Sequence, residues 1–140
     1  MDKILPFLAN HWMLVSAFAV LLIIIIISEM QRKIMGFKDL NPNETVRMIN
    51  DVEPVLIDVR EEAEFKSGHI VNSLNIPVGL LESRIAGLNI QSDKAVIVYC
   101  RSGQRSATAA TTLQKLGFRN VFKLGGGVMA WQSANLPLAK

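Results

Sequence analysis

The 140-residue sequence predicts an α/β domain, with a mainly parallel central sheet covered by helices on both faces, preceded by one transmembrane helix. Apolar runs that end at a polar or charged residue, such as 54–59 and 95–100, are typical of strands buried on both faces. Segments with helix start and stop signals lie between these runs, and strands that alternate with helices form parallel sheets. A long apolar run near the amino terminus predicts the membrane helix.

The apolar run at residues 12–28 reads WMLVSAFAVLLIIIIIS and contains no charge over 17 residues. A helix that is apolar on every side requires lipid or a protein core around it, so we expect a transmembrane anchor within residues 1–30. Residues 4–11 would add about two turns to the same helix. A cleaved signal peptide and a buried core helix are the alternatives, but Ser28-Glu29-Met30 offers no small-x-small cleavage site.

Basic residues gather after the apolar run rather than before it. Arg32, Lys33 and Lys38 follow the run, whereas Lys3 precedes it and is offset by Asp2. This charge bias predicts a single-pass protein of the inner (plasma) membrane with its domain in the cytoplasm, where a lone cysteine fits the reducing conditions. The net charge is only +3, with no Arg-rich face and few aromatic residues, so we expect no nucleic-acid partner.

A short linker, residues 31–40, is expected to join the anchor to a domain at residues 41–138. Asn41-Pro42-Asn43-Glu44 is a helix start signal, with Asn41 as the cap and Glu44 reaching back to it. That helix should end near Asn50. The elements expected after it are strand 54–59, helix 61–67 ended by Gly68, strand 74–76, helix 80–86, strand 95–100, helix 106–116 capped by Ser106, strand 121–124 and helix 128–134.

Cys100 is the only cysteine, and it lies where the strand at 95–100 ends. The loop Arg101-Ser102-Gly103-Gln104-Arg105 follows it and leads into an alanine-rich helix. Ligand sites of parallel sheets lie beyond the carboxyl ends of strands, and a helix amino terminus with a curled loop of N–H groups stabilises an anion. We therefore expect a reactive thiolate here; a buried structural cysteine is the alternative.

Motifs along the whole domain resemble those of single-domain rhodaneses, in particular bacterial inner-membrane rhodanese-like proteins. In chain order they are Asp58-Val59-Arg60-Glu61, Glu64-Phe65, Gly68-His69-Ile70, Asn75-Ile76-Pro77, YCRSGQRS at 99–106, Gly117-Phe118, Gly125-Gly126 and Trp131. The resemblance implies a rhodanese-like fold and a sulfurtransferase. Such an enzyme takes a sulfane sulfur from a donor such as thiosulfate, holds it as a cysteine persulfide, and passes it to cyanide or a thiol.

The resemblance also implies which residues form the site. Cys100 is expected to be the nucleophile and sulfur carrier. Arg105 is expected either to point at the anionic substrate or to pair with an acidic residue such as Glu64, and Arg101 either assists at the mouth of the site or is solvated. The substrate-binding residues expected from the loop are Arg101, Ser102, Gly103, Gln104, Arg105 and Ser106, several of them through backbone N–H groups.

Other polar residues of the motifs are expected to support the site rather than to react. Asp58 and Arg60 end the neighbouring strand at the same edge, so a catalytic role is the alternative for them, but the resemblance implies that they hold the local turn by hydrogen bonds and an ion pair. His69 is expected to bond backbone groups rather than to act as a general base. One cysteine and two distant histidines do not provide a metal-ligand set, and no cofactor is expected.

The length of the loop distinguishes sulfur transfer from phosphatase chemistry. Arg105 comes five positions after Cys100, one fewer than in phosphatases of similar topology, and a tighter loop suits a single sulfur atom better than a phosphate. Phosphatase or arsenate reductase activity is therefore disfavoured. The second hypothesis is a membrane-tethered binding module that docks a membrane protein complex, with incidental turnover or none. Under the enzyme hypothesis the partners are a small sulfur-donor anion and a thiol or protein acceptor.

Overall fold

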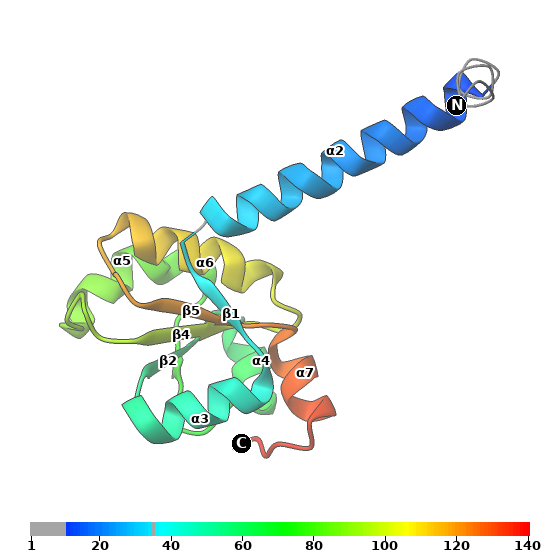
Figure 1. Cartoon of the computed structure of the whole chain (residues 1–140). Coiled ribbons are helices and arrows are strands. Elements are labelled where there is room, and N and C mark those ends of the chain that lie inside the picture. The colour runs from blue at the N-terminus through cyan, green and yellow to red at the C-terminus, as the bar shows by residue number, and fades with distance from the viewer. Residues whose placement is uncertain (1–10, 35) are drawn as a thin grey trace. The chain divides into compact units, whose positions relative to one another are not determined.

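The structure is a computed structural model that describes residues 11–34 and 36–140. The chain divides into two compact units, Met1–Gly36 and Phe37–Lys140, which are considered separately. The first contains helix α2 (Trp12–Ile34), and the second contains the sheet and the remaining helices (Figure 1).

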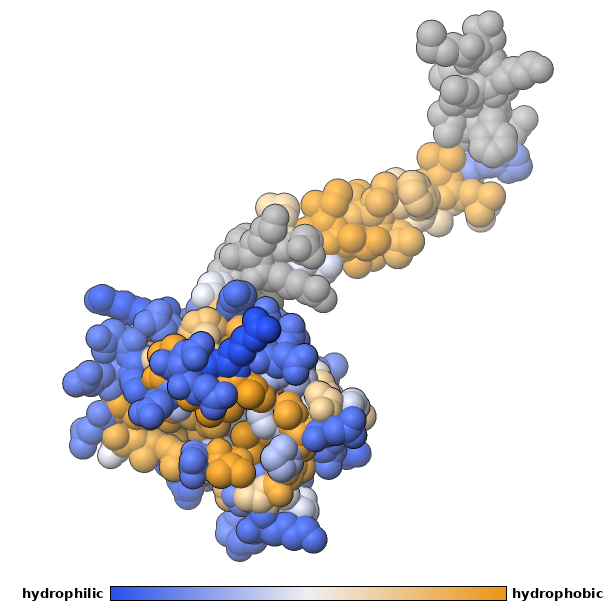
Figure 2. Space-filling model, turned by 60° about the horizontal axis from the view of Figure 1, so that its bottom comes forward, coloured by the Kyte–Doolittle hydropathy of each residue, from blue (hydrophilic) through white to orange (hydrophobic). Residues whose placement is uncertain are grey.

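Helix α2 is 23 residues long, and its large apolar side chains are exposed from Trp12 to Ile27. Apolar side chains cover most of the surface that it shows in Figure 2. Within residues 11–34 and 36–140, however, no helix is both long and apolar enough to cross a membrane. The transmembrane helix expected at residues 12–28 is thus not found. Its 17 uncharged residues span about 26 Å, against about 30 Å for a hydrocarbon core. Residues 4–10 of the expected extension lie outside the described residues.

Five strands form a sheet in which every pairing is parallel, in the order β1-β5-β4-β2-β3. The mainly parallel sheet predicted from the sequence is therefore confirmed. In register, Val55 lies opposite Val96, and Val96 lies opposite Val121. The strands are β1 (Lys38–Leu40), β2 (Val55–Asp58), β3 (Leu74–Asn75), β4 (Val96–Tyr99) and β5 (Val121–Leu124).

Helices cover both faces of this sheet, as predicted (Figure 1). One face carries α5 (Leu81–Ile85) and α6 (Gln104–Lys115), and the other carries α3 (Pro42–Val52) and α7 (Gly127–Ser133). A short helix, α4 (Glu62–Ser67), follows β2, and the 3₁₀ turns η1 (Val78–Leu80) and η2 (Ala86–Leu88) flank α5.

The central strands supply two hydrophobic cores because successive side chains point to opposite faces. Val96 and Val98 pack with Leu113 of α6 in the first core, which also contains Cys100. Ile97 and Tyr99 pack with Trp131 of α7 in the second. All four side chains of β4 are fully buried, which is why its sequence shows no polar alternation.

The start of α3 follows the expected signal closely. The backbone N–H of Glu44 donates to the Asn41 side chain at 2.9 Å, and the backbone N–H of Asn41 donates to the Glu44 carboxylate at 2.8 Å. This capping box satisfies two N–H groups that would otherwise be left open at the helix end. It fixes the direction in which the chain enters the domain.

Three expected boundaries are wrong. Strand β1 (Lys38–Leu40) lies in the segment expected to be a linker. The sequence did not predict this strand because two of its three side chains are exposed and no apolar pattern marks it. Helix α6 begins at Gln104 with Gly103 at the cap, whereas the sequence favoured Ser106 there. The helix expected at 80–86 is a short α-helix between two 3₁₀ turns.

Candidate functional site

Cys100 lies at the carboxyl edge of the sheet, directly after β4 and before the loop that leads into α6. The neighbouring strand β2 ends at the same edge, since Asp58 is in register with Tyr99. The Cys100 side chain is only 1% exposed. The parallel topology thus brings the thiol and the residues after β2 to one edge, as expected for a ligand site in such a sheet.

The loop curls around the sulfur atom. The backbone N–H of Gly103 donates to Cys100 Sγ at 3.1 Å, and the Ser106 hydroxyl oxygen lies 3.6 Å from the same sulfur. Gly103 adopts a φ of +104°, a backbone conformation that glycine reaches at little cost. Burial raises the pKa of the Cys100 thiol, but hydrogen bonds from Ser106, Gly103 and Ser102 outweigh it, so the pKa lies below its ordinary value.

The first turn of α7 holds the outer side of this loop. The backbone N–H of Val128 donates to the Cys100 carbonyl at 2.9 Å, and that of Met129 donates to the Arg101 carbonyl at 3.1 Å. In a planar trans peptide the C=O and N–H groups point in opposite directions. When α7 holds the Arg101 carbonyl, the N–H of Ser102 in the same peptide therefore turns toward the sulfur.

Gly127 makes this contact between α7 and the loop possible. Its φ is +57°, and an added Cβ would collide with the carbonyl oxygen of Cys100 and lie 2.6 Å from that of Arg101. Sequence reasoning missed this role and those of Val128 and Met129. The available signal was the run of three glycines, Gly125-Gly126-Gly127, after β5.

Arg105 pairs with Glu64 of α4, one of the two arrangements expected for it. Its guanidinium donates to both carboxylate oxygens, at 2.7 and 2.9 Å. Each side chain is about one-third exposed, at 36% and 32%. The hydrogen bond from Arg105 is the main reason why the pKa of Glu64 falls from 4.5 to about 2.

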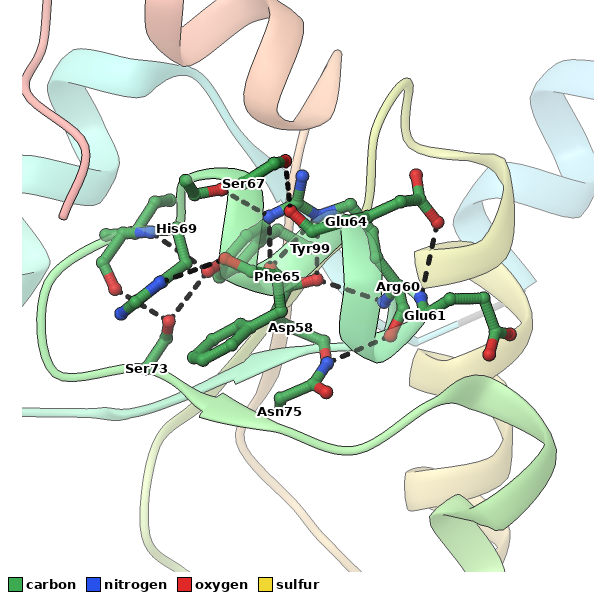
Figure 3. Close-up of polar contacts among 12 residues, drawn as sticks. Asp58, Arg60, Glu61, Glu64, Phe65, Ser67, His69, Ser73, Asn75 and Tyr99 are labelled. Carbon is green, nitrogen blue, oxygen red and sulfur yellow. Dashed lines mark hydrogen bonds and ion pairs between the residues drawn. The ribbon is translucent and has the colours of Figure 1, made fainter. Parts of the chain in front are cut away.

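Asp58 and Arg60 form a buried ion pair at the end of β2 (Figure 3). Arg60 Nη2 donates to Asp58 Oδ2 at 2.6 Å and to the Gly68 carbonyl at 2.8 Å. The Asn75 side-chain amide donates to the backbone carbonyls of both residues, at 3.1 and 2.9 Å. These contacts join the end of β2 to the end of α4 and to β3, so the pair holds the turn.

His69 lies in the same cluster and contacts Phe65 through its ring. Its ring stacks on Phe65 with 3.8 Å between centroids, and its Nδ1 lies 3.1 Å from the Phe65 carbonyl. The hydroxyl of Tyr99 accepts from the backbone N–H of Ile70 and bonds to Ser73 (Figure 3). Sequence reasoning gave Tyr99 no role beyond its motif, and the two hydrogen bonds show that it ties β4 to the segment after α4.

A pocket of about 380 Å³ borders the loop at Arg101 and reaches α4, α7 and the carboxyl-terminal segment. Arg101 is exposed, and it makes no ion pair with another described residue. A larger hollow of about 550 Å³ along α4 and η1 contains no residue of the loop. In the described part of the chain no three His, Cys, Asp or Glu side chains are grouped to hold a metal ion.

Comparisons with known proteins agree with this geometry. Residues 41–134 match the rhodanese-like domain family. The uncharacterized protein YibN of Escherichia coli is 33% identical, with 100% of this chain and 99% of YibN covered. A putative mitochondrial thiosulfate sulfurtransferase of Schizosaccharomyces pombe is 40% identical over 64% of this chain and 70% of its own length.

Solved structures of rhodanese-related proteins share the fold. The crystal structure of a rhodanese-related protein from Thermoplasma volcanium has a TM-score of 0.66 and 31% identity, and the match covers 74% of this chain and 98% of that one. The expected rhodanese-like α/β fold is thereby confirmed. The chain belongs to the rhodanese-like domain family.

Proposed function

We propose that the protein is a sulfurtransferase in which Cys100 carries the transferred sulfur as a persulfide. The observation that carries the proposal is the loop of backbone N–H groups around a cysteine that lies at the carboxyl edge of the sheet. Such a loop stabilises a negative charge on sulfur, and the thiolate is the nucleophilic form of cysteine. The relative from Schizosaccharomyces pombe, named a putative thiosulfate sulfurtransferase, supports this assignment.

The reaction proceeds in two displacements. The Cys100 thiolate attacks the outer sulfur of the donor, the bond between the two donor sulfurs breaks, and sulfite leaves when the donor is thiosulfate. Cys100 then holds a persulfide whose outer sulfur lies about 2 Å beyond Sγ. An acceptor such as cyanide or a thiolate attacks that outer sulfur and regenerates the Cys100 thiolate. Two transfers through a covalent intermediate replace one difficult step.

The residues of the loop have separate roles in this scheme. The N–H groups of Ser102, Gly103 and Ser106 stabilise the charge on the thiolate and on the persulfide. Arg101, at the border of the pocket, attracts the anionic donor. Gln104 is the first residue of α6 and contributes its position at the helix amino terminus, which favours an anion.

Mass spectrometry of the intact protein tests the proposal. After incubation with thiosulfate, the wild-type chain should gain the mass of one sulfur atom, and a thiol reductant should remove it. Cys100→Ser should show no gain, and wild-type protein alkylated beforehand should show none either. A Cys100→Ser variant that forms thiocyanate from thiosulfate and cyanide at the wild-type rate would refute the assignment. A wild-type chain that gains no sulfur from any donor would favour the binding-module alternative.

We also propose that α2 attaches the protein to a membrane, with the domain of residues 37–140 in the cytoplasm. The support is the exposed apolar surface of α2 and the basic residues Arg32, Lys33 and Lys38, which follow its apolar run in the sequence. The full chain should sediment with membranes, whereas a chain that begins at residue 37 should stay in the supernatant. Recovery of both forms in the supernatant would refute the attachment.

A further inference from the structure

The charges around Cys100 are largely cancelled before any donor arrives. The pKa of the Arg105 guanidinium is raised, mainly by its hydrogen bond to Glu64. The negative charge of Cys100 contributes to the same rise, so Arg105 lies close to the thiolate. Both of its terminal nitrogens, however, are engaged by the Glu64 carboxylate, at 2.7 and 2.9 Å. The pocket is lined by Glu64, whereas Arg105 does not line it. The lining of the pocket includes Arg101 but not its neighbour Cys100, so the part of a donor that extends from the transferred sulfur into this pocket meets the carboxylate of the pair.

The other cations near the loop are engaged in the same way. Arg60 lines the pocket, but its guanidinium donates to Asp58 and to a backbone carbonyl. Lys123 lies behind Gly103, and its ammonium group pairs with Asp39 at 3.1 Å. Arg101 is thus the single cation that lines the pocket without an ion-pair partner among the described residues.

The remaining walls of the pocket are suited to an organic group. Val128 and Met129 from α7 and Leu138 from the carboxyl-terminal segment line it, with polar contributions from Ser67 and Gln132. Met129 is 53% exposed, so its side chain is accessible to a bound group. One cation and an apolar wall match a donor with a single charge and a carbon substituent.

We infer that the preferred donor is a monoanionic sulfane-sulfur compound with an organic group, such as an organic persulfide or a thiosulfonate, rather than the thiosulfate dianion. This inference rests on the proposed sulfurtransferase function. For a thiosulfonate, the Cys100 thiolate attacks the outer sulfur, the bond between the two donor sulfurs breaks, and the sulfinate leaves with the electron pair. For a persulfide anion, the leaving group is the thiolate, which takes up a proton from water. No oxidant or reductant is required.

Two donors that differ by one charge provide the test. Methanethiosulfonate and thiosulfate transfer the same outer sulfur, but a methyl group replaces one charged oxygen in the first. The rate of persulfide formation on the full chain is measured with each donor and divided by the rate of that donor with a simple thiolate. We expect the normalised kcat/KM for methanethiosulfonate to exceed that for thiosulfate by about tenfold. An equal or higher value for thiosulfate would overturn the inference and leave the sulfurtransferase function intact.

The variant Glu64→Gln tests the cause of the preference. It removes one negative charge from the pocket wall and leaves Arg105 with its positive charge. The Coulomb energy is proportional to the charge of the donor. If Glu64→Gln raises kcat/KM for the thiosulfate dianion by about tenfold, it should therefore raise kcat/KM for the methanethiosulfonate monoanion by about threefold. Glu62→Gln is the matched control, since Glu62 lies on the same helix and pairs with Lys66 at the surface.

Each result has a definite meaning. If Glu64→Gln raises kcat/KM equally for the two donors, or for neither, the role given to the ion pair is overturned. If Glu64→Gln does not fold, the comparison of the two donors with the wild-type chain still decides the preference. If neither donor transfers sulfur to Cys100, the proposed function itself fails.

Discussion

Replacement of Gly127 by alanine is the most direct test of how the loop around Cys100 is held. The new Cβ would collide with the Cys100 carbonyl and lie 2.6 Å from the Arg101 oxygen, so α7 and the loop must move apart. Two backbone hydrogen bonds, at 2.9 and 3.1 Å, join them at this point. Their loss costs about 1 kcal/mol each.

The backbone conformation of Gly127 adds a second contribution. Alanine at a φ of +57° is strained by about 1–2 kcal/mol, and the smaller entropy of the unfolded chain offsets roughly half of this. The total loss of unfolding free energy is therefore about 3 kcal/mol. Gly117→Ala is the matched control, because Gly117 has a φ of +95° but nothing within 4 Å of an added Cβ. That variant should lose only about 1 kcal/mol.

Urea unfolding followed by the fluorescence of the buried Trp131 measures both losses. Gly127→Ala should also raise the pKa of Cys100, since displaced loop carbonyls would turn N–H groups away from the sulfur. The rate of Cys100 alkylation as a function of pH measures this change. The alkylation midpoint should rise in Gly127→Ala and stay unchanged in Gly117→Ala. Equal stabilities for the two variants, with the same alkylation midpoint, would refute the role of Gly127.

Three further predictions follow from the ion pairs and the hydrogen bonds of the site. Asp58→Asn should cost about 3–5 kcal/mol in urea unfolding because it leaves a buried guanidinium without its charge partner, whereas Glu62→Gln, which breaks a fully exposed pair of the same 2.6 Å length, should leave the unfolding free energy nearly unchanged; similar losses would refute the effect of burial. The pKa of Glu64 falls from 4.5 to about 2, so its ion pair stabilises the fold fully above pH 4.5, and this contribution should be lost as the pH falls through about 2; urea midpoints that fall equally in Glu64→Gln would contradict this. Ser106→Ala should raise the pKa of Cys100 toward its ordinary value, seen as a higher midpoint in the pH profile of alkylation, and an unchanged midpoint would assign the whole effect to backbone N–H groups.

Much of the fold could be predicted because its signals are local. The buried run at 95–100 and the capping box of Asn41 each depend on a few consecutive residues. Strand β1 could not be predicted, because what makes it a strand is its pairing with β5, about 80 residues later in the chain. The start of α6 was misplaced because Ser106 is a residue type that favours helix caps, whereas in the fold Gly103 is the cap and the Ser106 hydroxyl donates to the Gly103 carbonyl from inside the first turn.

The sequence by itself determined the α/β class, the parallel sheet and the position of Cys100 at the carboxyl end of a buried strand. The tertiary structure alone decided which partner Arg105 takes, because Glu64 lies 41 positions away and only the folded chain brings the two side chains together. It also decided that α7 holds the loop through Val128 and Met129. This contact joins backbone groups, so it hardly depends on which side chains stand at these positions. Secondary structure depends mainly on residues that are neighbours in the sequence, whereas the charge and shape of the site depend on elements that meet only in the folded chain.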